Sequence, residues 1–324
     1  MASFEDELSA TLHERPTVVV SSGTLALQLA LQALDIGVGD EVVVPAFTFA
    51  ATANAVRLAG ATPVFADVRP DDLALAPETV EPVLTERTAA VIVVHLYGQS
   101  ADLSALRDLC DRRGLALVED ACQAQGALFD GAPVGTFGDA AALSFYATKN
   151  VAIGEGGAVI AADATVAARV RLMRSHGMPS RDEQVLLGTN ARMTDVAAAV
   201  GRVQLRRLPA ALAPRAKNAA TYATSLEGVR LPSTIAGREP AWNLYTIGVD
   251  PSRRDAAERD LAAAGVATGV YYRVPLHRMP PFCGGRSLPV AERVAREVLS
   301  LPVHPGVTPE VVDRVASALR TVVR

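Results

Sequence analysis

The stretch TVVVSSGTLALQLALQAL, residues 17–34, contains the pattern that decides the fold. Its first four residues are β-branched and predict a strand, and the apolar residues after Gly23 recur at helical spacing to about Leu34. A strand, a short polar turn and an amphipathic helix form half of a βαβ unit. The same succession recurs through the first two-thirds of the chain, so the sequence predicts an α/β fold with a mostly parallel central sheet.

Short apolar runs and helical patterns alternate along this region. We expect further strands at residues 41–44, 62–65, 89–96, 115–119, 140–146 and 158–161, and helices at residues 103–113, 194–208 and 210–226. The run at 89–96 is rich in Val and Ile, which is typical of a strand covered on both faces. The last two helices are expected to be separate because Pro209 lies between them.

The pattern changes after Gly228. We expect a strand near residues 241–249, a helix at 254–264 and a terminal helix at 309–322. The sequence therefore predicts a large α/β domain at residues 1–228 and a smaller α+β domain at residues 229–324.

Composition excludes several classes of protein. The chain has 324 residues, of which 50% are hydrophobic and 20% charged, as in a globular protein. A net charge of −4 without a basic tail argues against nucleic acid as a partner. The apolar run at 42–56 is too short and polar to span a membrane, and the acidic start is unlike a secretory signal. Three scattered cysteines and five histidines without ligand spacing predict no metal and a cytoplasmic location.

Ligands of an open α/β sheet bind beyond the carboxyl ends of its strands, so the residues directly after each strand are candidates. Ser21, Ser22, Gly23 and Thr24 follow the first strand and open a helix. Serine can cap free N–H groups, glycine allows close approach, and the helix dipole favours an anion, which together predict a phosphate cradle. Taken alone, the same residues more often cap an ordinary helix. Neither GxGxxG nor GxxxxGK[ST] is present, which argues against dinucleotide and P-loop sites.

Polar residues also follow two other predicted strands. Asp120 directly follows the strand at 115–119, with Gln123 three residues on, although a lone Asp there usually caps a helix. Lys149 lies before a glycine turn and would form a Schiff base if buried, although most loop lysines are solvated. A phosphate cradle, a carboxylate and a lysine at one sheet edge are what pyridoxal phosphate (PLP) requires. Phe49 is then a candidate to stack on the PLP ring rather than a plain core residue.

The chain resembles the DegT/DnrJ/StrS family of sugar aminotransferases, which are fold-type-I PLP-dependent transferases. The resemblance runs in order from residue 21 to about residue 308. The matching segments are SSGTLALQLAL, GDEVVVPAFTFAATANAV, HLYGQSADLSAL, VEDACQAQGA, SFYATKN…GEGGAV, RMTDVAAAVGRVQL and SLPVHPGVT. The resemblance implies a mostly parallel sheet in a large domain and a smaller C-terminal α+β domain.

The resemblance also implies roles for residues of the cofactor site. Lys149 would hold the PLP aldehyde and act as general base, and Asp120 would pair with the ring nitrogen. Gln123 would meet the phenolic oxygen of the ring, and Phe49 would stack on its face.

By the same resemblance, Gly23, Thr24 and Ser144 bind the PLP phosphate. Asn190 would reach that phosphate from the partner subunit, which implies a homodimer with shared active sites.

The chain departs from the family pattern at three places. The stretch ahead of its first strand is shorter than in most members, so we expect a pocket that is more open or differently closed. Ala147 stands where Pro is common, and Gln125 stands where His is common. Lys149 is present, whereas the sugar-dehydrating branch has His there, and this favours transamination.

We therefore expect a PLP-dependent aminotransferase that converts a ketone on a nucleotide-linked sugar or a cyclitol to an amine, with L-glutamate or L-glutamine as donor. Candidate substrate contacts are Arg192, Tyr272, Arg273 and His277. One alternative is a PLP-dependent sugar dehydratase or lyase. Another is a non-catalytic PLP-binding regulatory or accessory protein.

Overall fold

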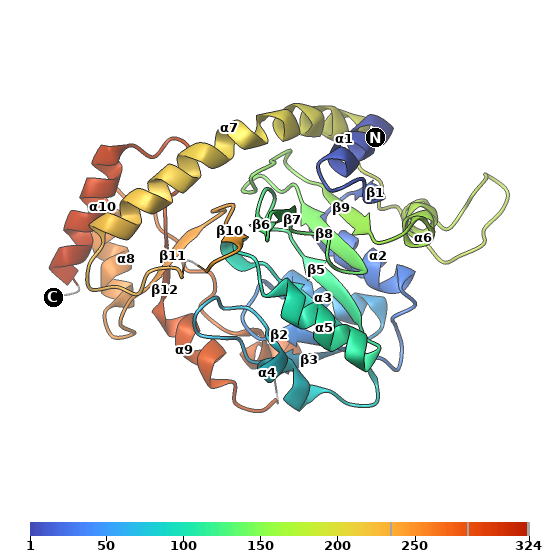
Figure 1. The fold of residues 1–324 in the computed structure, drawn as a ribbon, viewed down its shortest axis with the longest axis horizontal. Helices are drawn as coiled ribbons and strands as arrows, with labels where there is room; N and C mark the ends of the chain where they lie inside the picture. The colour runs from blue at the N-terminus through green and yellow to red at the C-terminus, as the bar shows by residue number, and fades with distance from the viewer. Residues whose placement is uncertain (234, 284, 323–324) are drawn as a thin grey trace.

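The computed structural model of the chain describes residues 1–233, 235–283 and 285–322. In this part of the chain, seven strands form a central sheet in the order β1, β9, β8, β5, β4, β2, β3 (Figure 1). Their bounds are β1 (Thr17–Val20), β2 (Glu41–Pro45), β3 (Thr62–Ala66), β4 (Thr88–Val94), β5 (Ala116–Asp120), β8 (Ala140–Ser144) and β9 (Gly157–Ala161).

The five strands from β8 to β3 are parallel to one another, whereas β9 runs antiparallel to both β8 and β1. The prediction of a mostly parallel sheet is confirmed. The carboxyl ends of β2, β4, β5 and β8 therefore lie at one edge of the sheet, where a ligand can meet the residues that follow each strand.

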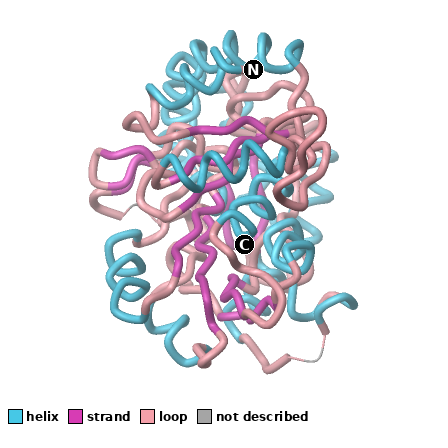
Figure 2. Tube along the Cα trace, turned by 90° about the vertical axis from the view of Figure 1, so that its right-hand side faces the viewer, coloured by secondary structure: helices cyan, strands magenta, loops and turns pink. Residues whose placement is uncertain are grey.

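Helices cover both faces of the sheet (Figure 2). Alternate residues of a strand point to opposite faces, so Val18 and Val20 contribute to one core and Val19 to the other. The first face packs against α2 (Gly23–Ala33), α3 (Ala50–Ala59) and α6 (Ala164–Arg174). The second packs against α1 (Ala2–Ala10), α5 (Leu103–Arg113) and the first half of α7 (Asp195–Ser225).

Helix boundaries follow local capping chemistry. Ser22 Oγ accepts a hydrogen bond from the Leu25 N–H at 3.2 Å at the start of α2. Asp102 caps α5 in the same way, and Gly114 ends α5 in the left-handed conformation with φ 65°. These signals are local, and for that reason they were visible in the sequence.

The expected break at Pro209 was wrong. Helix α7 continues through Pro209 and Pro214 and runs from α1 to the C-terminal helices (Figure 1). A proline inside a helix leaves the carbonyl four residues earlier, here that of Leu205, without its intrahelical hydrogen bond, and this loss has to be offset by packing. Packing at both ends keeps the helix continuous: Gly201 lies against the Phe4 ring, and Tyr222 is fully buried.

A separate core lies at the C-terminal end of the molecule. It contains α8 (Arg254–Ala263), α10 (Pro309–Val322) and a two-stranded sheet of β11 (Tyr245–Gly248) and β12 (Val298–Leu301). The end of α7 belongs to this core as well, because Tyr222 packs on Tyr245 with ring centroids 5.0 Å apart. The predicted domain boundary at residue 228 stays a prediction.

The remaining elements are short or peripheral. They are α4 (Pro77–Val80), α9 (Pro289–Glu297), β6 (Leu128–Phe129), β7 (Ala132–Pro133), β10 (Arg238–Glu239) and four 3-10 turns at η1 (Glu81–Val83), η2 (Leu96–Gly98), η3 (Leu276–Arg278) and η4 (Pro280–Phe282). Among the described helices, none combines the length and the apolar character needed to cross a membrane.

Candidate active site

A cavity of about 460 Å³ lies at the carboxyl ends of the parallel strands. The residues that the sequence singled out lie around it together: Gly23, Thr24, Phe49, Asp120, Gln123, Ser144, Lys149 and Tyr272. They come from five different segments of the chain, and the sheet brings most of them together because its strand ends converge at this edge.

Asp120 is the last residue of β5 and is buried. Its Oδ2 accepts a hydrogen bond from Thr52 Oγ1 at 2.8 Å, and its Oδ1 accepts one from the Cys122 N–H at 3.2 Å. Thr52 in turn lies 3.3 Å from the hydroxyl of Thr48. These contacts hold the carboxylate in one orientation against the cavity.

Glu119 anchors the same strand on the opposite face of the sheet. Its carboxylate accepts backbone hydrogen bonds from Gly135, Phe137 and Gly138 and lies 3.1 Å from His95 Nε2. Burial raises the pKa of Glu119, but His95 and these N–H groups outweigh burial and hold the pKa below its usual value. The buried carboxylate fixes the end of β5, and with it the position of Asp120.

Lys149 follows β8 in a turn where its N–H donates to the Tyr146 carbonyl at 2.9 Å. Among the described residues, its ammonium has neither an ion pair nor a side-chain hydrogen bond. Burial lowers the pKa of Lys149, while Cys122 and Asp120 act in the opposite sense. A lysine with a lowered pKa has a larger neutral fraction, which makes it a better nucleophile.

The N-terminus of α2 fits a phosphate. The N–H groups of Gly23 and Thr24 make no hydrogen bond with the described residues, as expected for the first turn of a helix. A Cβ at Gly23 would lie 2.8 Å from the Cβ of Ser144, so only glycine allows α2 to approach β8 this closely. Free N–H groups at a positive helix end next to the Ser144 hydroxyl form an anion cradle.

The opposite wall of the cavity is aromatic and amide-rich. The Phe49 ring lies 5.8 Å from the Tyr272 ring, centroid to centroid. Gln123 donates from Nε2 to the Tyr272 hydroxyl at 3.1 Å and accepts from the Tyr97 N–H at 2.8 Å. Burial raises the pKa of Tyr272, so its hydroxyl stays protonated.

Four predicted site residues lie outside the cavity in the described part of the chain. Asn190 and Arg192 are exposed on the segment that follows α6 and do not line the cavity. Arg273 pairs with Asp255 and Glu258 on the surface. His277 is buried, with Nε2 3.0 Å from Glu292.

The structure adds residues that the sequence did not suggest. Thr52 holds Asp120, and Asn243, Leu244 and Tyr271 form part of the cavity wall. The one sequence signal that could have indicated Thr52 is the pair of threonines, Thr48 and Thr52, after the strand at 41–44. No signal in the sequence could have found Asn243, because it is far along the chain from the other lining residues.

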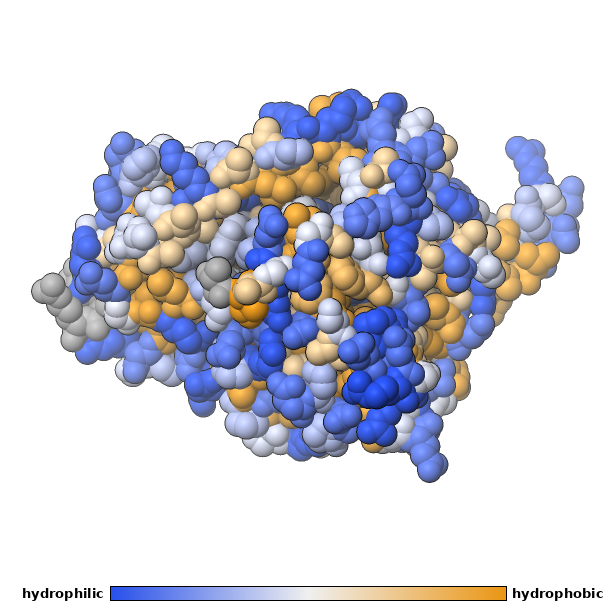
Figure 3. Space-filling view, in the orientation of Figure 1, coloured by the Kyte–Doolittle hydropathy of each residue, from blue (hydrophilic) through white to orange (hydrophobic). Residues whose placement is uncertain are grey.

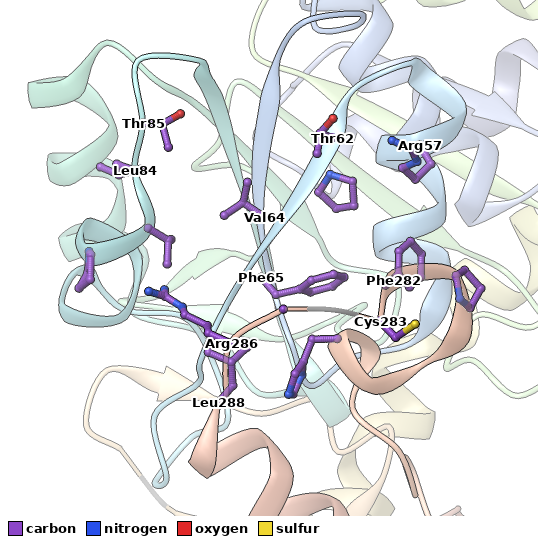
Figure 4. A pocket seen from close by; sticks show the side chains of 16 residues that line it. Arg57, Thr62, Val64, Phe65, Leu84, Thr85, Phe282, Cys283, Arg286 and Leu288 are labelled. Carbon is purple, nitrogen blue, oxygen red and sulfur yellow. The ribbon is translucent and has the colours of Figure 1, made fainter.

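A second depression, of about 780 Å³, lies along the edge strand β3 (Figure 4). Phe65 and Phe282 meet in it edge to face, with centroids 5.5 Å apart, and Arg57 and Arg286 lie at its rim. It shares no lining residue with the cavity that contains Lys149. It is more open and holds no carboxylate–lysine pair among the described residues, so the smaller cavity is the candidate active site.

The cavity meets each requirement of PLP. The free N–H groups of α2 would hold the phosphate, Asp120 would hold a proton on the ring nitrogen, and Lys149 would hold the aldehyde. On this parallel sheet, such an arrangement defines the class: a PLP-dependent enzyme of fold type I.

Comparison with known proteins identifies the group within this class. The chain belongs to the DegT/DnrJ/EryC1/StrS aminotransferase family, whose model matches residues 1–320. The family resemblance seen in the sequence is confirmed.

Two curated relatives cover almost the whole chain. The erythromycin biosynthesis sensory transduction protein EryC1 of Saccharopolyspora erythraea is 44% identical over 98% of this chain and 88% of its own length. The dTDP-3-amino-3,4,6-trideoxy-alpha-D-glucose transaminase of Streptomyces venezuelae is 42% identical over 99% of this chain and 86% of its own length.

Two solved structures share the fold. DesV of S. venezuelae superposes with a TM-score of 0.95 at 41% identity, covering all of this chain and 89% of that chain. NtdA of Bacillus subtilis, solved with bound PMP, superposes with a TM-score of 0.93 at 32% identity, covering 99% of this chain and 76% of that chain. PMP is the aminated form of PLP, the cofactor that the site here fits.

Proposed function

We propose that this PLP-dependent aminotransferase moves an amino group from L-glutamate or L-glutamine to a ketone on a nucleotide-linked sugar. A cyclitol is the alternative acceptor. The observation that carries the proposal is Lys149, which is partly buried, lies in the same cavity as Asp120 and has no ion pair with any described residue. The acceptor class is supported by relatives named as sugar transaminases, with dTDP-linked and UDP-linked substrates.

Different residues of the chain have different roles in transamination. PLP, when bound, supplies a protonated ring that accepts the electrons of the bond broken at the donor carbon. Lys149 Nζ takes the proton from that carbon, and its lowered pKa increases the fraction of the amine that is neutral and can act as a base. Asp120, oriented by Thr52, keeps the ring nitrogen protonated. Phe49 lines the cavity and is exposed, so its ring is free to cover the cofactor face.

A homodimer with shared sites is part of this proposal. Val196, Val200 and Val203 are exposed apolar residues at spacing i, i+4, i+7, so they form a stripe on one face of α7. Figure 3 shows hydrophobic surface among the hydrophilic residues along α7. Leu187 is 90% exposed on the segment that projects beyond α6 at the right of Figure 1. Exposed apolar groups of this kind mark protein interfaces.

A homodimer with shared sites would also explain the position of Asn190. It lies at the base of the projecting segment, where it pairs with Ser175, and it does not line the cavity of its own chain. We infer that the segment crosses to a second copy of the chain, where Asn190 completes the phosphate cradle. The cytoplasmic location expected from the sequence stays a prediction.

The test begins with the cofactor. The purified protein should turn yellow with PLP, and borohydride reduction should fix the cofactor to the one peptide that contains Lys149. Added L-glutamate or L-glutamine should then bleach the yellow colour, and a panel of keto-sugar nucleotides should yield an aminated product by mass spectrometry. A protein that stays colourless with PLP contradicts the proposal.

The same experiment separates the alternatives. A regulatory PLP-binding protein would be labelled at Lys149 but would not be bleached by either amino acid. A dehydratase would release water from the sugar without incorporating nitrogen. The relative EryC1 is named as a sensory transduction protein, so the outcome expected of a regulatory protein is worth measuring.

A further inference from the structure

Asn243 is a buried polar residue whose side chain has no hydrogen-bond partner among the residues that the structure describes. It precedes β11, is 7% exposed and lines the candidate active-site cavity. Its Oδ1 accepts no hydrogen bond, and its Nδ2 donates none, in the described part of the chain. A buried polar group without a hydrogen bond is destabilising, so an unpartnered amide facing a cavity indicates a group that a ligand satisfies.

A few other described residues also have a buried side-chain atom without a hydrogen bond. A buried, unpartnered side-chain nitrogen or oxygen is also found at Arg107, Gln125, Asn150, Arg174, Arg215 and His277. None of these lines the cavity that contains Lys149. Among the described residues, Asn243 alone combines an orphaned buried atom with a place in the active-site wall.

The backbone around Asn243 is tightly held, so the side chain cannot easily turn elsewhere. The Leu244 N–H donates to the Tyr97 carbonyl at 3.1 Å, and Arg215 donates to the Trp242 carbonyl at 2.9 Å. A Cβ at Gly98 would lie 2.9 Å from the backbone nitrogen of Asn243, so the two segments are in close contact. The Tyr97 N–H also donates to Gln123, so Asn243 lies next to the segment that forms the aromatic wall.

The hydrogen-bonding groups of the Asn243 amide indicate which kind of ligand fits it. It offers both an acceptor, Oδ1, and a donor, Nδ2. A carboxylate only accepts hydrogen bonds and an ammonium only donates, so either would leave half of the amide unpaired. A hydroxyl group donates and accepts, and a sugar carries several of them.

We propose that Asn243 binds a hydroxyl group of the acceptor sugar and is a specificity-determining residue of this enzyme. The inference rests on the proposed function, because it assumes a hydroxylated acceptor. It assigns Asn243 to the acceptor and not to the α-carboxylate that L-glutamate and L-glutamine share, because a carboxylate can pair with only the donor half of the amide.

Calorimetry on the PLP-loaded protein tests this inference with ligands that have no ketone and therefore do not react. The probes are dTDP-glucose, UDP-N-acetylglucosamine and GDP-mannose, each paired with its free nucleoside diphosphate. The quantity compared is the ratio of the affinity for the sugar nucleotide to that for the free nucleotide. Asn243→Leu removes both halves of the amide at similar volume, Asn243→Asp keeps an acceptor, and Asn54→Leu is the matched control on the exposed face of α3.

We expect Asn243→Leu to lower this ratio about tenfold for the sugar nucleotide that the wild type prefers, as for the loss of ordinary hydrogen bonds. Binding of the free nucleotide should not change. Asn243→Asp should lose less, because a hydroxyl can still donate to it, and Asn54→Leu should match the wild type. The yellow colour of bound PLP and the melting temperature establish that each variant is folded and loaded.

Two results would overturn the inference alone. One is an unchanged ratio in Asn243→Leu. The other is an Asn243→Asp protein that L-glutamate no longer bleaches while its affinity ratio is intact, which would place Asn243 at the donor carboxylate. A wild type that prefers none of the sugar nucleotides over its free nucleotide would instead overturn the proposed acceptor class, and this inference with it.

Discussion

Gln123 and Tyr272, 149 positions apart in sequence, are joined by a hydrogen bond of 3.1 Å from Nε2 to the hydroxyl. The Tyr97 N–H donates to the other end of the Gln123 amide, so the orientation of that amide is fixed on both sides. Tyr97 also donates from its hydroxyl to the Tyr271 carbonyl. The C-terminal part of the chain is thus tied directly to the residues that follow β5.

Substitution of Tyr272 should separate the role of its hydroxyl from that of its ring. Tyr272→Phe keeps the ring against Phe47 and Phe49 and should cost about 1 kcal/mol of unfolding free energy, the loss of one hydrogen bond. Tyr272→Ala also removes the ring and should cost about 3 kcal/mol. Denaturant unfolding measures both. Equal losses in the two variants would show that the ring contacts contribute nothing.

Asp120→Ala should damage catalysis much more than folding. Loss of one well-placed electrostatic group in a dry site slows reactions by about 10²–10³-fold. The half-reaction with L-glutamate measures this rate. Asp120→Asn is the matched variant, because its amide oxygen still accepts from Thr52 but carries no charge. If Asp120→Ala melts earlier yet bleaches at nearly the wild-type rate, Asp120 only caps the following turn.

Asn190→Ala should weaken retention of PLP, because a hydrogen bond to a phosphate is stronger than a neutral one. Equilibrium dialysis of the cofactor measures the loss. In a mixture of Lys149→Ala and Asn190→Ala chains, unfolded and refolded together, the hybrid dimer should contain one intact site. Failure to recover activity in that mixture would contradict the shared site. Asn54→Ala, exposed on α3, serves as the control.

The stability of the cofactor-free protein should depend on the charge of Lys149. Burial lowers the pKa of Lys149 from its usual 10.5, so the folded state favours the neutral amine and the unfolded state binds more protons. Stability should therefore rise with pH toward 10.5. Lys149→Met removes this titration, so the variant should be the more stable protein near neutral pH. Its advantage should shrink as the pH rises, and a pH-independent difference would exclude this explanation.

Glu292 should stabilise the folded state, and this stabilisation should be lost at low pH. His277, Arg278 and the Leu288 N–H bind its carboxylate and lower its pKa from 4.5 to about 2. A lowered carboxyl pKa stabilises the folded state fully above the unfolded value and is lost as the pH falls through the folded value. The stability difference between wild type and Glu292→Gln should therefore be constant above pH 4.5 and fade toward pH 2. Thermal melts across this range measure it, and a difference that persists at pH 2 would contradict the assignment.

The sequence by itself determined the sheet and the residues that follow its strands. Apolar runs, caps such as Ser22 and stops such as Gly114 act within a few residues, so their pattern is complete in the local sequence. Asp120 and Lys149 were predictable for a related reason: parallel strands end at the same edge of a sheet, and a residue at a strand end therefore lies at the ligand site.

Only the tertiary structure decided the features that depend on contacts between residues far apart in the sequence. Pro209 predicts a helix break, yet α7 continues because both of its ends are packed against separate cores. The far wall of the cavity is formed by Asn243 and Tyr272, which reach the site through contacts with Tyr97 and Gln123. Such contacts join residues more than a hundred positions apart, and their energy depends on how whole elements pack, which no short stretch of sequence specifies.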